Sequence, residues 1–408
     1  MTTVASRSGV DSAYAWRLAL VSAFCICLGG GSIYLPVVAL KEIAAEFGDR
    51  RSVPSLAYLL GFFSMGVGGV VMGWLADRTS PRVPLLIAGV SIVAGGFIAS
   101  SGGELALYAG YMLPLGFLGN AATFTPAMNN IQGWFERRRS TAVSIISAGP
   151  AISGFIWPQV YRWLLPDVGW RQTLVIYGVI AGTLLFACAF YVRPAPVVRH
   201  HGGKRPPEDL SVLPMPSLTL MGLLSAAGFC CCVAMAMPFV HMVAFCGDLG
   251  FSAARGAEAV SLILATAIAS VFAMGRLSDY IGPLRVSILC SLIQIVSLVG
   301  FVVVDSLTGV YTLSIVLGIP YIAIVQGYAL ILRQLYGPTI AGWRLGVVML
   351  FAMAGMAVGG WMGGAVFDAT LSYRAAFQAA LAFNILNLML LGTLFFIQRR
   401  RLYSQVRP

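Results

Sequence analysis

The chain has 408 residues, of which 59% are hydrophobic and 10% are charged, and its net charge is +11. A soluble domain carries about 25% charged residues, so the composition excludes a soluble fold and indicates an integral membrane protein. The positive charge lies in loops between apolar stretches, so we expect a lipid bilayer and no nucleic acid among the partners.

The charged residues leave twelve apolar stretches of 17 or more uncharged residues between them. The stretches are 18–40, 52–76, 83–103, 105–135, 140–161, 172–192, 210–247, 259–275, 286–304, 306–332, 345–367 and 375–398. A spanning helix needs about 20 residues. We therefore predict an all-α membrane protein with twelve transmembrane helices, six in each half.

The charges also predict an orientation. The two termini and every second loop together hold 19 of the 26 Lys and Arg residues, whereas the other side holds seven bases against nine acids. Lys and Arg concentrate on the cytoplasmic side of a membrane protein. We predict a multi-pass protein of the cell membrane with both termini in the cytoplasm.

The first span contains Gly29–Gly30–Gly31–Ser32, followed by Tyr34 and Pro36. Glycine costs about 1 kcal/mol in a helix interior, so three in a row favour close helix packing, because small residues let backbones approach. A substrate that touches bare backbone is the alternative.

After the second span comes a short charged loop, Gly73 to Arg82, and it has a copy at Gly275 to Arg285. The glycines and the aspartates Asp77 and Asp279 are each 202 residues apart, which indicates an internal repeat. Asp77 is placed to accept hydrogen bonds at the following helix start and to pair with Arg78 or Arg82. The loop is therefore either a topological anchor or a latch, and its repetition favours the latch.

The fourth span is the most polar one, with Asn120, Thr123, Thr125, Asn129, Asn130 and Gln132. Amides that face lipid are costly, so this helix faces protein or a cavity. The fifth span contains Pro150 and Pro158 and continues with Gln159. Proline removes a backbone hydrogen bond, so this helix is predicted to bend.

Residues 193–216 form the longest polar segment and hold six prolines. We interpret it as a cytoplasmic linker between domains at residues 1–192 and 217–408. His200–His201 has no nearby third ligand, so a metal site is not expected there.

The seventh span holds His241, an ionisable residue, toward its outer end. Such a residue suggests function, although a hydrogen-bonded interfacial histidine is the simpler alternative. The tenth span contains two polar residues, Tyr321 and Gln326.

The sequence shows no acid or base near the middle of a span, no phosphate-binding loop of the Walker type and no catalytic cluster. All eight cysteines fall in or at the ends of spans without metal-ligand spacing. We therefore expect no enzyme, no catalytic residue, no cofactor, no metal and no ATP-driven pump, and we expect a monomer that binds a small molecule.

The two loops at residues 73–82 and 275–285 resemble the signature of the major facilitator superfamily, and the resemblance covers the whole chain. It implies two pseudo-symmetric six-helix bundles around a central cavity, alternating access, and a cavity lined by spans 1, 4, 7 and 10. The gating residues that it implies are Asp77, Arg78, Arg82, Asp279 and Arg285. The candidate substrate-cavity residues are Tyr34, Asn120, Thr123, Gln159, His241, Tyr321 and Gln326.

Within the superfamily, the chain looks most like the monocarboxylate transporter and oxalate:formate antiporter group. The resembling segments are Pro36 with Lys41–Glu42–Ile43, Trp134–Phe135 with Arg138–Arg139, Gly169–Trp170–Arg171, Pro238 to His241, and Asp248–Leu249–Gly250. The cationic positions of that group would fall near Val37 and Val271, where this chain has no charge. Gly149–Pro150 with Gly154 also resembles part of the fifth-span signature of drug/proton antiporters.

Three functions remain open at this point. The first is a secondary transporter of a small monocarboxylate-like anion, with proton coupling as an open question. The second is an exporter of neutral or amphipathic molecules, which an uncharged, Met- and aromatic-rich cavity favours. A non-transporting receptor on the same fold is the third, and it would need a soluble domain for which the sequence shows no candidate.

Overall fold

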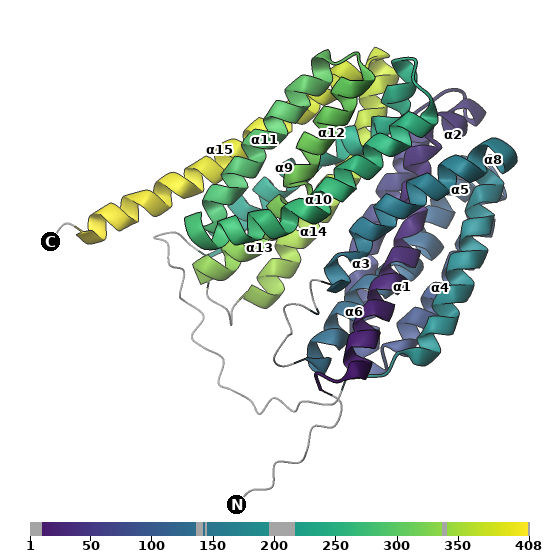
Figure 1. The fold of residues 1–408 in the computed structure, drawn as a ribbon, viewed down its shortest axis with the longest axis horizontal. Helices are drawn as coiled ribbons and strands as arrows, with labels where there is room; N and C mark the ends of the chain where they lie inside the picture. Colours follow the sequence, from purple (N-terminus) through teal and green to yellow (C-terminus); the bar gives the residue numbers. More distant parts are fainter. Residues whose placement is uncertain (1–9, 136–141, 143–144, 196–216, 337–340, 407–408) are drawn as a thin grey trace, which may run out of the picture. The chain divides into compact units, whose positions relative to one another are not determined.

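The computed structural model describes residues 10–135, 142, 145–195, 217–336 and 341–406, which form helices and contain no strand. The basic loop at 136–141 and residues 196–216 of the predicted linker lie outside the described residues. The helices are α1 (Ala13–Val38), α2 (Leu40–Glu46), α3 (Ser52–Arg78), α4 (Arg82–Ser100), α5 (Glu104–Gly110), the π-helix η1 (Tyr111–Asn120), α6 (Ala121–Trp134), α8 (Gly149–Tyr191), α9 (Ser217–Asp248), α10 (Ala253–Ile281), α11 (Pro283–Val303), α12 (Leu307–Tyr321), α13 (Ala323–Tyr336), α14 (Ala341–Thr370) and α15 (Tyr373–Val406) (Figure 1).

The predicted spans are present as helices. The described chain holds 11 helical segments long and apolar enough to cross a membrane, and one of them runs continuously from Ile145 to Tyr191. That segment changes direction at Gly169, which has φ 70° and ψ 171°, a left-handed conformation that favours glycine. The turn divides the segment into two arms of membrane-spanning length, so the predicted set of twelve spans is accounted for.

The chain divides into two compact units. Unit 1 comprises Met1–Leu35 and Phe63–Gly203, and unit 2 comprises Pro36–Phe62 and Lys204–Pro408. The end of α1, all of α2 and the start of α3 therefore belong to unit 2, although in sequence they fall within the first six spans.

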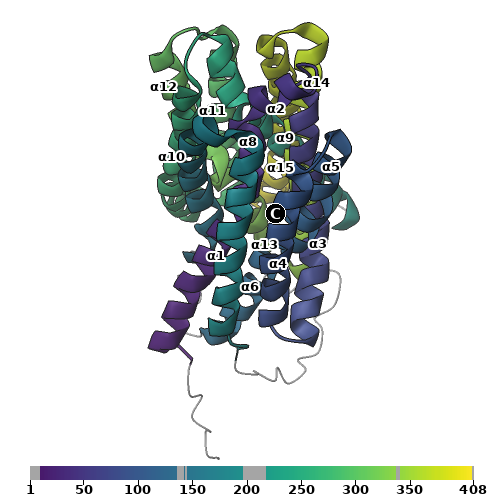
Figure 2. The ribbon, with the colours of Figure 1, turned by 90° about the vertical axis from the view of Figure 1, so that its right-hand side faces the viewer.

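In unit 1, α4 lies against α8 (Figure 2). The close approach depends on glycines on both helices. A Cβ at Gly182 would come 2.5 Å from the carbonyl oxygen of Gly89, and a Cβ at Gly178 would come 3.0 Å from that of Ile92. Small residues thus let the two backbones touch, as expected for helices packed within a bilayer.

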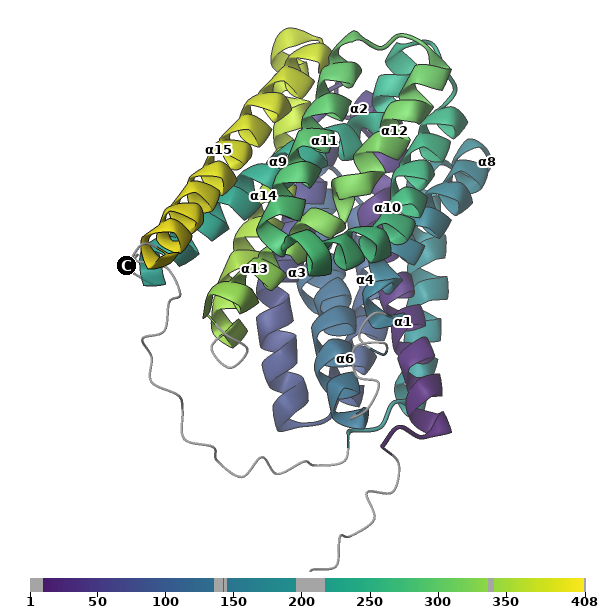
Figure 3. The same cartoon turned by 60° about the vertical axis from the view of Figure 1, so that its left-hand side comes forward.

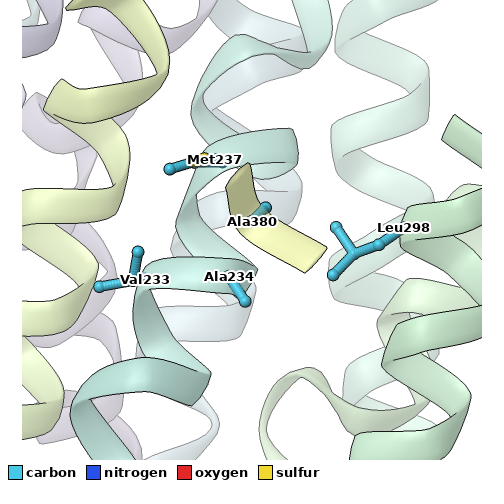
Figure 4. Packing of buried hydrophobic residues seen from close by; sticks show 5 residues of the cluster. All are labelled: Val233, Ala234, Met237, Leu298 and Ala380. Carbon is cyan, nitrogen blue, oxygen red and sulfur yellow. The ribbon is translucent and has the colours of Figure 1, made fainter. Parts of the chain in front are cut away.

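In unit 2, α9 is the central helix and contacts α10, α11, α14 and α15 (Figure 3). Its buried core residues Val233, Ala234 and Met237 pack with Leu298 of α11 and Ala380 of α15 (Figure 4). This arrangement explains the continuous apolar sequence of α9, because a helix covered on all sides has no polar face.

Candidate functional site

The glycine segment of α1 is held by side chains of unit 1. The carbonyl oxygen of Cys27 accepts hydrogen bonds from Ser153 Oγ (2.9 Å) and Trp157 Nε1 (2.8 Å). Tyr177 donates to Leu28 and Gly29, and Tyr161 donates to Gly31. The packing interpretation of the three glycines is confirmed, because a Cβ on any of them would come within 2.8 Å of a neighbouring side chain.

Pro36 creates one further need in α1. It has no N–H, so the carbonyl of Ser32, four residues earlier, lacks its helical partner. Tyr111 Oη donates to that carbonyl at 3.2 Å, and Asn120 Nδ2 donates to Ser32 Oγ at 3.2 Å. Both donors come from the two ends of η1, so the π-helix fixes the polar part of α1.

Three of the predicted cavity residues meet around this part of α1. Tyr34 Oη donates to the carbonyl of Pro150 at 3.1 Å. Asn120 bonds Ser32, and the Thr123 side chain fills the space beside Gly29. All three are buried within unit 1, and Gln159 lies half-buried on α8.

The predicted gating residues of unit 1 lie at the connection between α3 and α4. Asp77 and Arg78 are exposed, and the guanidinium of Arg78 lies 4.5 Å from the Trp74 ring centroid. Arg82 instead donates through Nε to the carbonyl of Val192, at the end of α8. Among the described residues, the carboxylate of Asp77 has no hydrogen-bond or ion-pair partner, so the latch remains a prediction.

The repeated segment in unit 2, predicted as a loop, forms the end of α10 and the start of α11, with Gly282 between the two helices. Arg285 is exposed at the start of α11, with its guanidinium 5.9 Å from the Phe395 ring centroid. Asp279 lies in α10, but its side chain falls outside the described part of the structure.

The remaining predicted cavity residues belong to unit 2 and do not cluster. Tyr321 lies at the end of α12, where the tenth span breaks before α13, and its ring contacts that of Phe239 at 5.1 Å. Gln326 is exposed on α13.

His241 is fully buried and binds within unit 2. Its Nε2 lies 2.8 Å from the carbonyl oxygen of Gly360, and its Nδ1 lies 3.1 Å from Tyr373 Oη. Because a carbonyl can only accept, Nε2 carries the proton and Nδ1 accepts from the tyrosine. His241 therefore joins α9 to α14 and α15, and a substrate could reach either nitrogen only by displacing one of these partners.

The structure also shows a charged cluster that the sequence analysis did not find. It lies in unit 2 and comprises Lys41, Arg51, Asp248, Asp368 and Tyr373, here called the Arg51 cluster. Arg51 binds Asp248 through both terminal nitrogens, at 2.5 and 2.8 Å, and Lys41 binds the same carboxylate at 2.5 Å. Burial lowers the pKa of Arg51, but the hydrogen bonds and charges of Asp248 and Tyr373 raise it by more. The pKa of Arg51 therefore lies above its usual value.

Asp368 has a different task in the Arg51 cluster. Its two carboxylate oxygens accept the backbone N–H groups of Arg51 and Ser52, each at 2.9 Å. These are among the amides left without partners at the start of α3. A residue at the end of α14 thus caps α3, so the two helices are joined by a charge-assisted contact.

A second group missed in the sequence is a buried polar network in unit 2. Asn384 and Asn387 of α15 bind Ser291 of α11, and Tyr328 of α13 donates to Asn387 Oδ1 at 2.8 Å. Such networks hold helices in one register because every member needs its partners. The signal in the sequence was the pair of amides in the otherwise apolar last span.

The family model of the Major Facilitator Superfamily matches residues 20–326. The chain belongs to this superfamily. Among superfamily relatives, the chain is 26% identical over 394 residues to monocarboxylate transporter 13 of Rattus norvegicus, covering 94% of this chain and 90% of the relative.

Two other superfamily members are informative. The Agnestins efflux protein AgnL12 of Paecilomyces divaricatus is 27% identical over 220 residues, which cover 53% of this chain and 49% of that protein. A solved bacterial homologue of the human lysosomal transporter Spinster, inward-facing and occupied, has a TM-score of 0.71 at 16% identity. The alignment covers 95% of this chain and 97% of that one, which shows a shared fold.

Proposed function

We propose that this protein is a secondary transporter that moves a small, monocarboxylate-like organic anion across the cell membrane by alternating access. The observation that carries the proposal is the similarity to a monocarboxylate transporter along nearly the whole length of both chains. The protein acts on its substrate by binding and release, without chemical conversion. It works as a monomer in the bilayer with both termini in the cytoplasm.

The binding groups that we propose in unit 1 are neutral. Tyr34, Asn120 and Thr123 lie around the polar part of α1. The Asn120 amide has a second N–H that can donate to a carboxylate, and the hydroxyls of Tyr34 and Thr123 can donate to it by exchanging their bonds to the carbonyls of Pro150 and Asn120. Positive helix ends add a further attraction for an anion. In unit 2 we assign a supporting role to Tyr321, Gln326 and His241, and in unit 1 to Gln159.

Transport is tested by uptake of labelled lactate into proteoliposomes, with and without an inward proton gradient. We expect saturable uptake that excess unlabelled pyruvate inhibits and that lactamide, an uncharged analogue, does not. Stimulation by the gradient supports proton coupling. Absence of saturable uptake for every monocarboxylate tested would reject the proposal.

A second function is an exporter of neutral or amphipathic molecules. Two observations favour it. One is the relative named as an efflux protein. The other is that Val37, which is fully buried, and Val271 lie near the positions where the monocarboxylate transporter group has cations, so this chain has no charge there for an anion. The test is efflux of amphipathic dyes from cells that express the protein, compared with cells that carry an Asp77→Asn variant. Dye efflux together with no lactate uptake would select this function.

A further inference from the structure

We propose that Lys41 and Arg51 form a binding site for the carboxylate of a transported anion, and that the Asp248 side chain occupies this site until the anion displaces it. The inference takes its ligand class from the proposed function. The site lies entirely in unit 2. It is separate from the neutral residues of unit 1 that we assign to the binding of the anion.

The first argument is the geometry of the cations. Arg51 Nη1 lies 2.5 Å from Asp248 Oδ2, and Arg51 Nη2 lies 2.8 Å from Oδ1. Lys41 Nζ approaches Oδ1 at 2.5 Å. A planar guanidinium fork combined with an ammonium group is how proteins bind a carboxylate tightly, and the side chain of Asp248 has the same head group as a small monocarboxylate.

The second argument is that Arg51 is oriented by groups other than Asp248. Its guanidinium carbon lies 3.7 Å from the Phe367 ring centroid and 5.0 Å from that of Tyr373. Its backbone N–H is held by Asp368. Both oxygens of Asp368 are used on backbone amides, so this acid does not take the place of Asp248 on the guanidinium fork.

The third argument is access. The side chains of Lys41 and Asp248 are 41% and 30% exposed, whereas that of Arg51 is 13% exposed. A dissolved anion can therefore reach the two cations from the exposed side of Lys41 and exchange with the Asp248 carboxylate. Lys41 Nζ lies against the backbone of Gly247, in space that a side chain would take, because a Cβ there would come 2.7 Å from it.

The consequence is a competition between two carboxylates. While Asp248 holds both cations, the end of α9 is tied to α2 and to the start of α3. An anion that replaces Asp248 satisfies the same cations and releases the end of α9. Anion binding and loosening of this end are therefore coupled, since one site cannot hold both carboxylates.

The test measures lactate binding by the purified full-length protein, with lactamide as the uncharged comparison. We expect Asp248→Asn to lower the Kd for lactate by about tenfold, because the cations no longer have a resident carboxylate to lose. The double variant Asp248→Asn with Arg51→Gln should lose this gain. Arg255→Gln is the matched control, since Arg255 is exposed and pairs with Glu258 instead.

A Kd unchanged or raised in a folded Asp248→Asn protein would overturn the proposal, as would a gain that persists without Arg51. Should Asp248→Asn fail to fold, Lys41→Gln provides the decision, because its side chain is partly exposed. We expect it to weaken lactate binding several-fold and Lys41→Arg to retain it, and equal Kd values for both would overturn the site.

The same data separate this inference from the proposed function. Binding that depends on Arg51 in a protein that shows no lactate uptake would support the site and reject lactate transport. Lactate uptake by the wild type with a Kd insensitive to Asp248→Asn would support transport and reject the site.

Discussion

Gly31→Ala tests the packing around α1 most directly. A Cβ at this position would lie 2.5 Å from Tyr177 Cε2 and 2.7 Å from Trp157 Cε2. Both rings are buried and are fixed by their own hydrogen bonds, from Trp157 to Cys27 and from Tyr177 to Leu28. The rings therefore cannot move aside without giving up a partner.

The expected magnitude combines three effects. Overpacking of a tight core costs about 1–3 kcal/mol, and loss of one ring hydrogen bond adds about 1 kcal/mol. Replacing glycine by alanine inside a helix returns about 1 kcal/mol. We therefore expect Gly31→Ala to lower the free energy of unfolding by about 1–3 kcal/mol.

The assay is equilibrium unfolding in mixed detergent micelles, followed by tryptophan fluorescence. Gly392→Ala is the matched control, because Gly392 lies in helix α15 and a Cβ there would meet nothing within 4 Å. It should leave stability unchanged or raise it. The reasoning is refuted if Gly31→Ala proves as stable as Gly392→Ala.

Three further predictions follow from described contacts. Tyr111→Phe should lower the free energy of unfolding by about 1–3 kcal/mol, because the Ser32 carbonyl loses its donor. Adding Pro36→Ala to this variant should recover part of that loss, because alanine restores a backbone N–H. A double-mutant cycle that shows no coupling between the two positions contradicts this. Asp368→Asn should cost about 0.5–2 kcal/mol through the weakened cap of α3, measured by thermal unfolding against the exposed Asp305→Asn, and equal stabilities count against it. Asp77→Asn should reduce the maximal rate of lactate uptake more than it raises KM, and an unchanged rate argues against the latch.

The helices were predictable because their cause is local. A bilayer demands a stretch of about 20 apolar residues with internally satisfied backbone groups, and this leaves a direct record in the sequence. The glycines at 29–31 were also correctly interpreted as a packing surface, since a run of small residues in a span has few other uses. The π-helix was not foreseen, although Pro114 within it removes one backbone hydrogen bond.

The Arg51 cluster was not predictable for a different reason. Arg51 and Asp248 are 197 residues apart, and Arg51 and Asp368 are 317 apart. Their pairing depends on how helices from distant parts of the sequence assemble, which spacing does not encode. The sequence did show that acids and bases nearly balance in the loops on the predicted non-cytoplasmic side of the membrane. That balance was the available hint of ion pairs.

The covalent path between the units has a mechanical consequence. The chain leaves unit 1 within α1, between Leu35 and Pro36, and returns to it within α3, between Phe62 and Phe63. At Pro36 the helix lacks one backbone hydrogen bond, and Tyr111 on unit 1 already holds the carbonyl left over. If the units move during a transport cycle, α1 bends most easily at this point. Each bend would then displace the side chain of Tyr34, which lies two residues away.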